Sequence, residues 1–142
     1  MRALAVVSLL FVVTACGGPS LGTELVKDMP YGKATIFHTD AVDAATAAKV
    51  FAAMTDATYN FASNLPEQID RVNGRLTLRL GNDNQDTIAK VEKNGTAEPV
   101  IRYFEGLSQH VGKAVGGEAV DIVLCKKTLA EPFFTVPGKP TK

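Results

Sequence analysis

The sequence predicts an α+β domain whose elements follow one another in the order β-α-β-β-α-β. Three observations support this order. Apolar side chains recur every three or four residues over residues 43–62 and again over 97–114, as in helices with one buried face. Between these stretches, Asn73-Gly74 joins two short segments in the manner of a β-hairpin. Segments rich in β-branched residues precede the first helix and follow the second.

The first strand and the first helix are expected within residues 33–62. Residues 33–39 carry Ile36 and Phe37 without glycine or proline, which is typical of a strand. Asp43 has a side chain suited to a helix N-cap, and the sequence Ser-Asn-Leu-Pro at 63–66 ends the helical pattern. The buried stripe of this helix is expected to consist of Ala47, Val50, Phe51, Met54, Thr58 and Phe61.

The hairpin is the clearest local signal. Its strands span residues 68–72 and 75–80, and Asn73-Gly74 suits the two positive-φ positions of a type I′ turn. In the second strand three leucines alternate with polar side chains, so one face is dry and the other wet. The dry positions are Leu76, Leu78 and Leu80, and the wet positions are Arg75, Thr77 and Arg79.

The second half of the chain repeats the helix and strand pattern. Residues 86–93 can form two turns of helix, and residues 97–114 form a longer one, with Thr96 as its cap and Gly116-Gly117 at its end. Residues 119–125 are a strand, and residues 132–136 can add a C-terminal strand. This order predicts a ferredoxin-like βαββαβ sandwich, with two helices on one face of an antiparallel sheet.

Residues 1–16 indicate where the protein works. Arg2 is followed by an apolar run from Ala3 to Val13, which is too short to span a bilayer and has the length of a signal-peptide core. The run ends in Val13-Thr14-Ala15-Cys16, which resembles the lipobox of bacterial lipoproteins. The resemblance implies a diacylglyceryl group on the Cys16 thiol, cleavage after Ala15 and acylation of the new amino terminus. An ordinary secretory signal, with Cys16 incidental, is the alternative.

The expected organisation follows from this assignment. It comprises a signal peptide at 1–15, a lipidated tether at 16–30, one α+β domain at 31–137 and a disordered tail at 138–142. Two or three acyl chains would make membrane attachment effectively permanent. Position 17 is Gly and not the Asp that commonly retains lipoproteins at the inner membrane, so the resemblance implies the outer membrane, facing the periplasm.

Composition and motifs restrict the possible functions. Acidic and basic residues are equal in number and interspersed, and no basic patch with interleaved aromatics predicts nucleic-acid binding. If Cys16 is lipidated, Cys125 has no disulfide partner in the chain. Residues 82–86 place oxygen side chains as a calcium loop begins, but the later Gly and Glu are missing, so we interpret them as a polar loop. We expect neither a metal site nor a cofactor.

From about residue 31 to 136 the chain also resembles a group of bacterial extracytoplasmic domains to which no activity is assigned. The matching segments are residues 36–39 running into 43–47, residues 76–79 and residues 120–125. Each is mainly a packing pattern, so the resemblance implies a fold and supplies no catalytic residues. The segment 81–98 departs from the pattern, so no site there is implied.

Three side chains could carry chemistry. Cys125 is the last residue of the last main strand, and it is a reactive thiol if Lys126 and Lys127 lower its pKa, or a buried structural residue otherwise. His38 and His110 could act as acid or base, but no carboxylate or serine near them in the sequence completes a triad. We therefore interpret both histidines as structural.

The wet face of the sheet is the stronger candidate for function. Arg75 and Arg79 are expected there with Asp121 and Val123, and Phe37 is expected between their two strands. Arginine and aromatic side chains are enriched where proteins bind one another, although such a ladder can also merely balance charge. The sequence thus predicts a membrane-anchored, non-enzymatic binding or assembly module with an envelope protein as partner. A Cys125- or histidine-dependent enzyme and a small-ligand or metal carrier are the alternatives, and the oligomeric state stays open.

Overall fold

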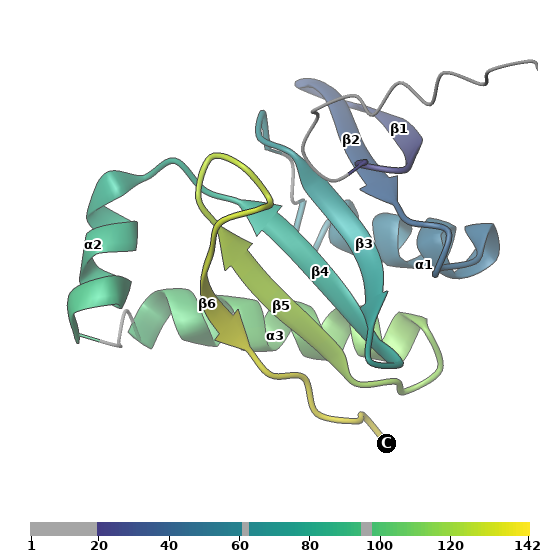
Figure 1. The fold of residues 1–142 in the computed structure, drawn as a ribbon. Helices are drawn as coiled ribbons and strands as arrows, with labels where there is room; N and C mark the ends of the chain where they lie inside the picture. Colours follow the sequence, from purple (N-terminus) through teal and green to yellow (C-terminus); the bar gives the residue numbers. More distant parts are fainter. Residues whose placement is uncertain (1–19, 61–62, 95–97) are drawn as a thin grey trace, which may run out of the picture.

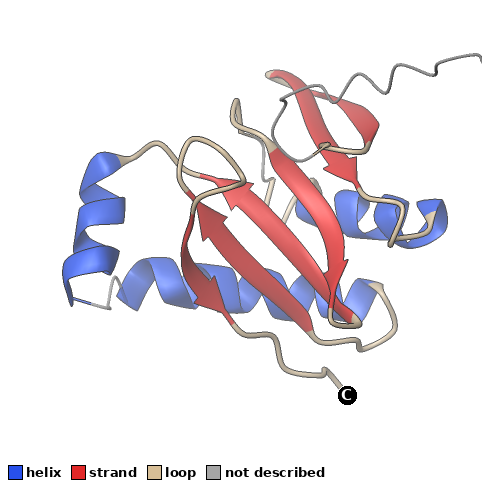
Figure 2. Ribbon diagram, viewed as in Figure 1, coloured by secondary structure: helices blue, strands red, loops and turns tan. Residues whose placement is uncertain are grey.

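The computed structural model describes residues 20–60, 63–94 and 98–142. In this part of the chain one six-stranded sheet carries α1 and α3 on the same face, behind the sheet in Figures 1 and 2, and α2 beside the β6 edge. The elements in chain order are β1 (Thr23–Met29), β2 (Gly32–His38), α1 (Ala44–Met54), β3 (Glu67–Val72), β4 (Arg75–Gly81), α2 (Gln85–Asn94), α3 (Glu98–Ala114), β5 (Val120–Cys125) and β6 (Pro132–Val136).

The strands lie in the sheet in the same order as in the chain, from β1 to β6. The pairs β1–β2, β3–β4 and β5–β6 are antiparallel, whereas β2–β3 and β4–β5 are parallel. Parallel neighbours need a long crossover connection. The segment containing α1 supplies it for the first pair, and the segment containing α2 and α3 supplies it for the second.

The α+β class is therefore present, but the prediction of a ferredoxin-like sandwich is wrong. In that fold the strand at 33–39 would lie between those at 75–80 and 119–125. Instead β4 and β5 pair directly from Leu76 to Gly81, and β2 has β1 and β3 as its neighbours. The hairpin between β1 and β2 is the physical reason, because it occupies the β2 edge that β5 would have needed.

The core lies between the sheet and the two covering helices. On the sheet side it contains the alternating leucines of β4 together with Ile122, all of them inaccessible to solvent or nearly so. On the helix side the apolar stripes of α1 and α3 bury Val50, Leu107 and Val111 completely. The periodicity of the sequence thus predicted correctly that the leucines of β4 and the stripes of α1 and α3 face the core. It was wrong for Thr58, which is exposed beyond the end of α1, and for Thr77, which is buried although its face of β4 was expected to be wet.

The first helix begins as predicted and ends earlier. The carboxylate of Asp43 accepts a hydrogen bond from the Thr46 N–H at 2.9 Å, as an N-cap does. The helix stops at Met54 rather than near residue 62. Thr55 donates its hydroxyl to the Phe51 carbonyl at 2.7 Å, and the next residue, Asp56, accepts the N–H of Thr58 at 2.9 Å. These local bonds replace those of a continuing helix.

The other local predictions agree with the structure. Asn73 and Gly74 have φ angles of 51° and 78°, as a type I′ turn requires, and Val72 pairs with Arg75 across it. The expected helices after β4 are α2 and α3, and the expected C-terminal strand is β6. Thr96, the expected cap of α3, and Phe61 of the first stripe lie outside the described residues.

Both ends of the described domain differ from the expected boundaries. The segment assigned to the tether contains the strand β1. It is part of the domain, because it pairs with β2 along seven residue positions. In the segment assigned to a disordered tail, the Gly138 N–H donates to Asp121 at 2.7 Å and the Thr141 N–H to the Gly117 carbonyl at 3.0 Å. The signal segment 1–15 and Cys16 lie outside the described residues. None of the helices described here is long and apolar enough to cross a membrane.

Candidate functional site

The face of the sheet opposite α1 and α3, here called the open face, collects most of the predicted binding residues. One row of paired positions crosses all six strands in the order Glu24, Phe37, Gln68, Arg79, Val123 and Thr135. The adjacent row contains Asp70, Thr77 and Asp121. The structure thus places Phe37, Arg79 and Val123 on one face in one row, but it inserts Gln68 between Phe37 and Arg79.

Arg75, one of the two predicted arginines, is engaged within the protein. Its Nε and Nη2 donate to the two carboxylate oxygens of Asp121 at 2.7 and 2.6 Å, and Nη2 also donates to the Gly138 carbonyl at 3.0 Å. The Arg75 hydrogen bond holds the pKa of Asp121 below its ordinary value. Since Asp121 also accepts the Gly138 N–H, the pair fixes the chain after β6 to the sheet.

Arg79 lies in a hollow of about 330 Å³, here called the Arg79 hollow. Its Nε is 3.9 Å from one carboxylate oxygen of Asp70, which is too long for a hydrogen bond. The other oxygen of Asp70 accepts the Thr39 hydroxyl at 2.6 Å and the Arg71 N–H at 2.8 Å. The hollow is lined by Ser20, Leu21, Thr39, Gln68, Asp70, Arg79, Leu129, Ala130 and Pro132.

The chain in front of β1 forms one wall of the Arg79 hollow. Gln68 donates its amide to the carbonyls of Leu21 and Ser20 at 2.9 and 3.3 Å, so this segment crosses the open face. Gly22 then has φ +95°, and a Cβ there would lie 2.1 Å from the His38 carbonyl oxygen, so only glycine fits. On the far side of Leu21 a second hollow, of about 350 Å³, includes Phe37 and Pro66 in its lining.

Cys125 is buried on the same side of the sheet and is not placed as a reactive thiol. Its side chain has no exposed surface, and burial raises its pKa despite the opposing contact with the Arg79 guanidinium. The expectation that Lys126 lowers this pKa is wrong, because Lys126 points to Glu92 at 2.8 Å instead.

The two histidines lie on the other side of the sheet from Cys125. His38 is buried with its Nδ1 at 3.1 Å from the Val42 carbonyl. The Nε2 of His110 is 2.5 Å from an Asp56 carboxylate oxygen, in a groove between α1 and α3. Partial burial acts to raise the Asp56 pKa, but the bond to His110 and two backbone N–H groups lower it overall. The structure therefore does not bring Cys125 together with either histidine.

The groove around His110 is cationic at its rim. Its lining is Lys49, Ala52, Ala53, Asp56, His110, Lys113 and Ala114. These described side chains include neither a hydroxyl nor a thiol, so the Asp56–His110 pair has no nucleophile to activate within the groove.

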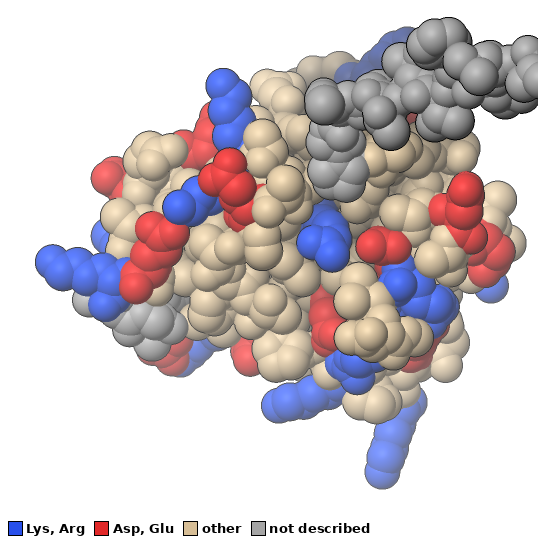
Figure 3. Space-filling view, viewed as in Figure 1, with Lys and Arg blue, Asp and Glu red and all other residues tan. Residues whose placement is uncertain are grey.

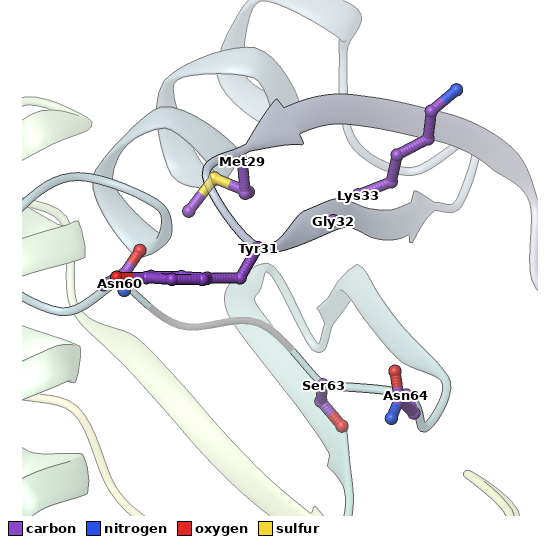
Figure 4. A pocket seen from close by; sticks show the side chains of 7 residues that line it. All are labelled: Met29, Tyr31, Gly32, Lys33, Asn60, Ser63 and Asn64. Carbon is purple, nitrogen blue, oxygen red and sulfur yellow. The ribbon is translucent and has the colours of Figure 1, made fainter.

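A third hollow lies beside the tip of the hairpin between β1 and β2. Figure 4 shows Tyr31 projecting from this tip, with Asn60 on one side and Ser63 and Asn64 on the other. Tyr31 is 95% exposed. The lining carries one amine, that of Lys33, and Figure 4 shows it directed away from the tyrosine ring. This hollow has less charge to offer a ligand than the Arg79 hollow.

Glu67 is a buried carboxyl that the sequence reasoning missed. It pairs with Leu80 on the helix side of the sheet and is 3% exposed. Within the described part of the chain its Oε1 has no hydrogen-bond partner. Desolvation raises its pKa to about 8, so the carboxyl is largely neutral at pH 7.

The polar loop at 82–86 uses its oxygen atoms locally. Asn82 accepts the N–H of Asn84 at 2.8 Å, and Asn84 accepts the N–H of Thr87 at 3.0 Å at the start of α2. Across residues 20–60, 63–94 and 98–142 no cluster of three or more His, Cys, Asp or Glu is arranged to hold a metal ion.

Part of this site could have been found from the sequence. Counting back from the Asn73-Gly74 turn pairs Asp70 with Thr77 and Gln68 with Arg79, which places Asp70 and Gln68 on the open face. The approach of Asp56 to His110, 54 residues apart, has no local signal.

Among known proteins, neither the family models, nor the curated sequences, nor the solved structures contain a match to this chain.

Proposed function

We propose that the protein is a lipid-anchored, non-enzymatic binding module of the cell envelope that uses the Arg79 hollow. One observation carries the proposal. Arg75 has two short bonds to a carboxylate, whereas Arg79, four residues further along the same strand, has one carboxylate neighbour at 3.9 Å. A guanidinium has five N–H donors, so Arg79 retains donors for an anionic group of a ligand.

The lipid anchor is supported by the sequence before the domain. The apolar run and the lipobox-like Val13-Thr14-Ala15-Cys16 favour acylation of Cys16 and attachment to the outer membrane on its periplasmic side. On this proposal the acyl chains hold the protein at the membrane, and the Arg79 hollow on the open face binds a ligand there.

The anchor can be tested by feeding cells an alkyne-tagged fatty acid. We expect the label on the wild-type protein in the membrane fraction and no label on the Cys16→Ser variant. A Cys16→Ser protein that is labelled and sedimented like the wild type would refute the anchor.

Occupation of the hollow can be tested by arginine modification with phenylglyoxal. Arg102 is an internal reference, because it lies on α3 with 74% of its side chain exposed and, within the described residues, pairs with Glu98 one turn away. We expect Arg79 to react several times more slowly in intact envelopes than after detergent extraction, with Arg102 unchanged. Equal slowing of both arginines would mean that the hollow is empty in the envelope.

A further inference from the structure

We infer that the Arg79 hollow receives a phospholipid headgroup of the membrane that holds Cys16, with the phosphate at Arg79 and a primary ammonium at Asp70. This inference rests on the proposed function, since it takes the anchor and the hollow from there. It adds the identity of the ligand and the orientation of the domain on the membrane.

The length of chain between the anchor and the hollow supports a lipid ligand. Ser20 is part of the wall of the hollow, and it follows Cys16 by only four residues. Four residues span at most about 14 Å even when fully extended. The backbone of Ser20 is thus always within that distance of an anchored Cys16, so the hollow stays close to the headgroup layer.

The charges in the hollow fit a zwitterion better than an ion of one sign. The planar fork of Arg79 matches phosphate oxygens. Next to it, one oxygen of Asp70 is occupied by Thr39 and Arg71, but the oxygen facing Arg79 has only the 3.9 Å approach of that arginine. Asp70 would repel a purely anionic ligand and Arg79 a purely cationic one. A headgroup with both a phosphate and an N–H-bearing ammonium satisfies both side chains.

The rest of the open face is compatible with a lipid surface. Figure 3 looks onto this face and shows an uncharged area over β5 and β6, with charged side chains around it. Val26 lies on the same face as Phe37 and is 51% exposed. The second hollow, beyond Leu21, adds Phe37, Leu65 and Pro66 as apolar lining.

The opposite face offers the competing orientation. The groove between α1 and α3 carries Lys49, Lys113 and His110, which would attract anionic lipids. However, the sheet separates this groove from Ser20, which lies beside Gln68 on the open face. The two orientations therefore predict different contacts with lipid.

The test uses the full lipidated chain in vesicles, with a photo-activatable amino acid at one position. Ala130 lines the Arg79 hollow and Ala114 lines the α1–α3 groove, and both are exposed alanines. We expect phospholipid adducts by mass spectrometry at position 130 and few at 114. The adducts at 130 should be more abundant in vesicles of phosphatidylethanolamine with phosphatidylcholine than in phosphatidylcholine alone or with phosphatidylglycerol.

Variants identify the contacts. Arg79→Gln should reduce the adducts at 130 about tenfold, the value of one charge-assisted hydrogen bond, while Arg102→Gln leaves them unchanged. Asp70→Asn keeps an acceptor for Thr39 and Arg71, and it should remove the preference for phosphatidylethanolamine without removing the adducts.

The outcomes separate the two proposals. Unmodified Cys16 in the mass spectrum would overturn the anchor and this inference together. A lipidated protein with adducts mainly at 114, or with equal yields in all vesicles, would overturn only the inference. Yields at 130 that are unaffected by Arg79→Gln would do the same.

Discussion

At the scale of single residues, the same side chain has different roles depending on its neighbours. Arg75 and Arg79 alternate with leucines on one strand and share one face. Arg75 meets Asp121 and the C-terminal segment and becomes a structural clamp. Arg79 meets Asp70 at a longer distance, inside a hollow. The distance to the nearest carboxylate thus decides which arginine can serve a ligand.

The Cys125 thiol should be unreactive in the folded protein. It is fully buried, and burial raises its pKa, so little thiolate reaches solvent at neutral pH. We expect alkylation by iodoacetamide at pH 7.5 to be roughly a hundredfold slower than in the urea-unfolded chain, since access requires a local opening of about 3 kcal/mol. Peptide mapping reads Cys125 separately from Cys16. Equal rates in the folded and unfolded chains would restore the thiol-enzyme hypothesis.

At the scale of the elements, side-chain bonds determine where segments end and how they are fastened. Thr55 and Asp56 end α1 by competing for backbone groups. Asp121 on β5 holds the segment after β6 by accepting bonds from both Arg75 and the Gly138 N–H. Gln68 on β3 holds the segment before β1 through two carbonyls. Both ends of the described chain are therefore attached to strands in the middle of the sheet.

Removing the Asp121 carboxylate should loosen the C-terminal segment. Asp121→Ala leaves Arg75 and the Gly138 N–H without their partner, and we expect a loss of about 1–2 kcal/mol in unfolding free energy. Because the folded state lowers the Asp121 pKa, this stabilisation is present at neutral pH and disappears as pH falls through the lowered pKa in acid.

Urea titration at pH 7 measures the loss, and hydrogen exchange should show faster exchange at the Gly138 amide. Glu98→Ala is the matched control, since it breaks the exposed bond to Arg102 and should change stability by less than about 0.5 kcal/mol. The clamp assignment fails if the two variants are equally stable.

At the scale of the whole molecule, the two-layer arrangement brings a titratable group into the core. Glu67 begins β3 on the helix side of the sheet, where water does not reach it. Because the pKa of Glu67 is about 8 in the folded protein, its carboxyl takes up a proton on folding at pH values where it is ionised in the unfolded chain. The free energy of unfolding of the entire domain is thereby linked to pH.

Glu67→Gln should remove this dependence. Below a pH of about 4.5 the carboxyl is protonated in both states, so its burial costs least there. As pH rises from 4.5 toward 8, the wild type should lose up to about 1.4 kcal/mol per pH unit from this group. The variant should match the wild type near pH 4.5 and exceed its stability at pH 8.

Urea denaturation at several pH values measures both curves. The control is Glu105→Gln, which removes an exposed carboxylate on α3 and should leave the slope unchanged. Parallel curves for Glu67→Gln and the wild type would show that the buried carboxyl is ionised in the folded protein.

The sequence by itself determined the local structure of this protein. The leucine alternation of β4, the Asn73-Gly74 turn and the Asp43 cap depend on residues close together in the chain, and each is present as predicted. The wet face of β4 with its arginines follows from the same alternation. The proposal of a lipid anchor also rests on the sequence alone, because Cys16 lies outside the described residues.

Only the tertiary structure decided the strand order, and with it the site. Local periodicity does not reveal which strand edge a later strand will join. Here β1, a largely exposed strand, pairs with the edge of β2 where a ferredoxin-like order has another strand. The separation of Cys125 from both histidines, the pairing of Asp56 with His110 and the burial of Glu67 depend on contacts between residues far apart in the chain. Such contacts form only when the whole core closes, because no short segment contains both partners.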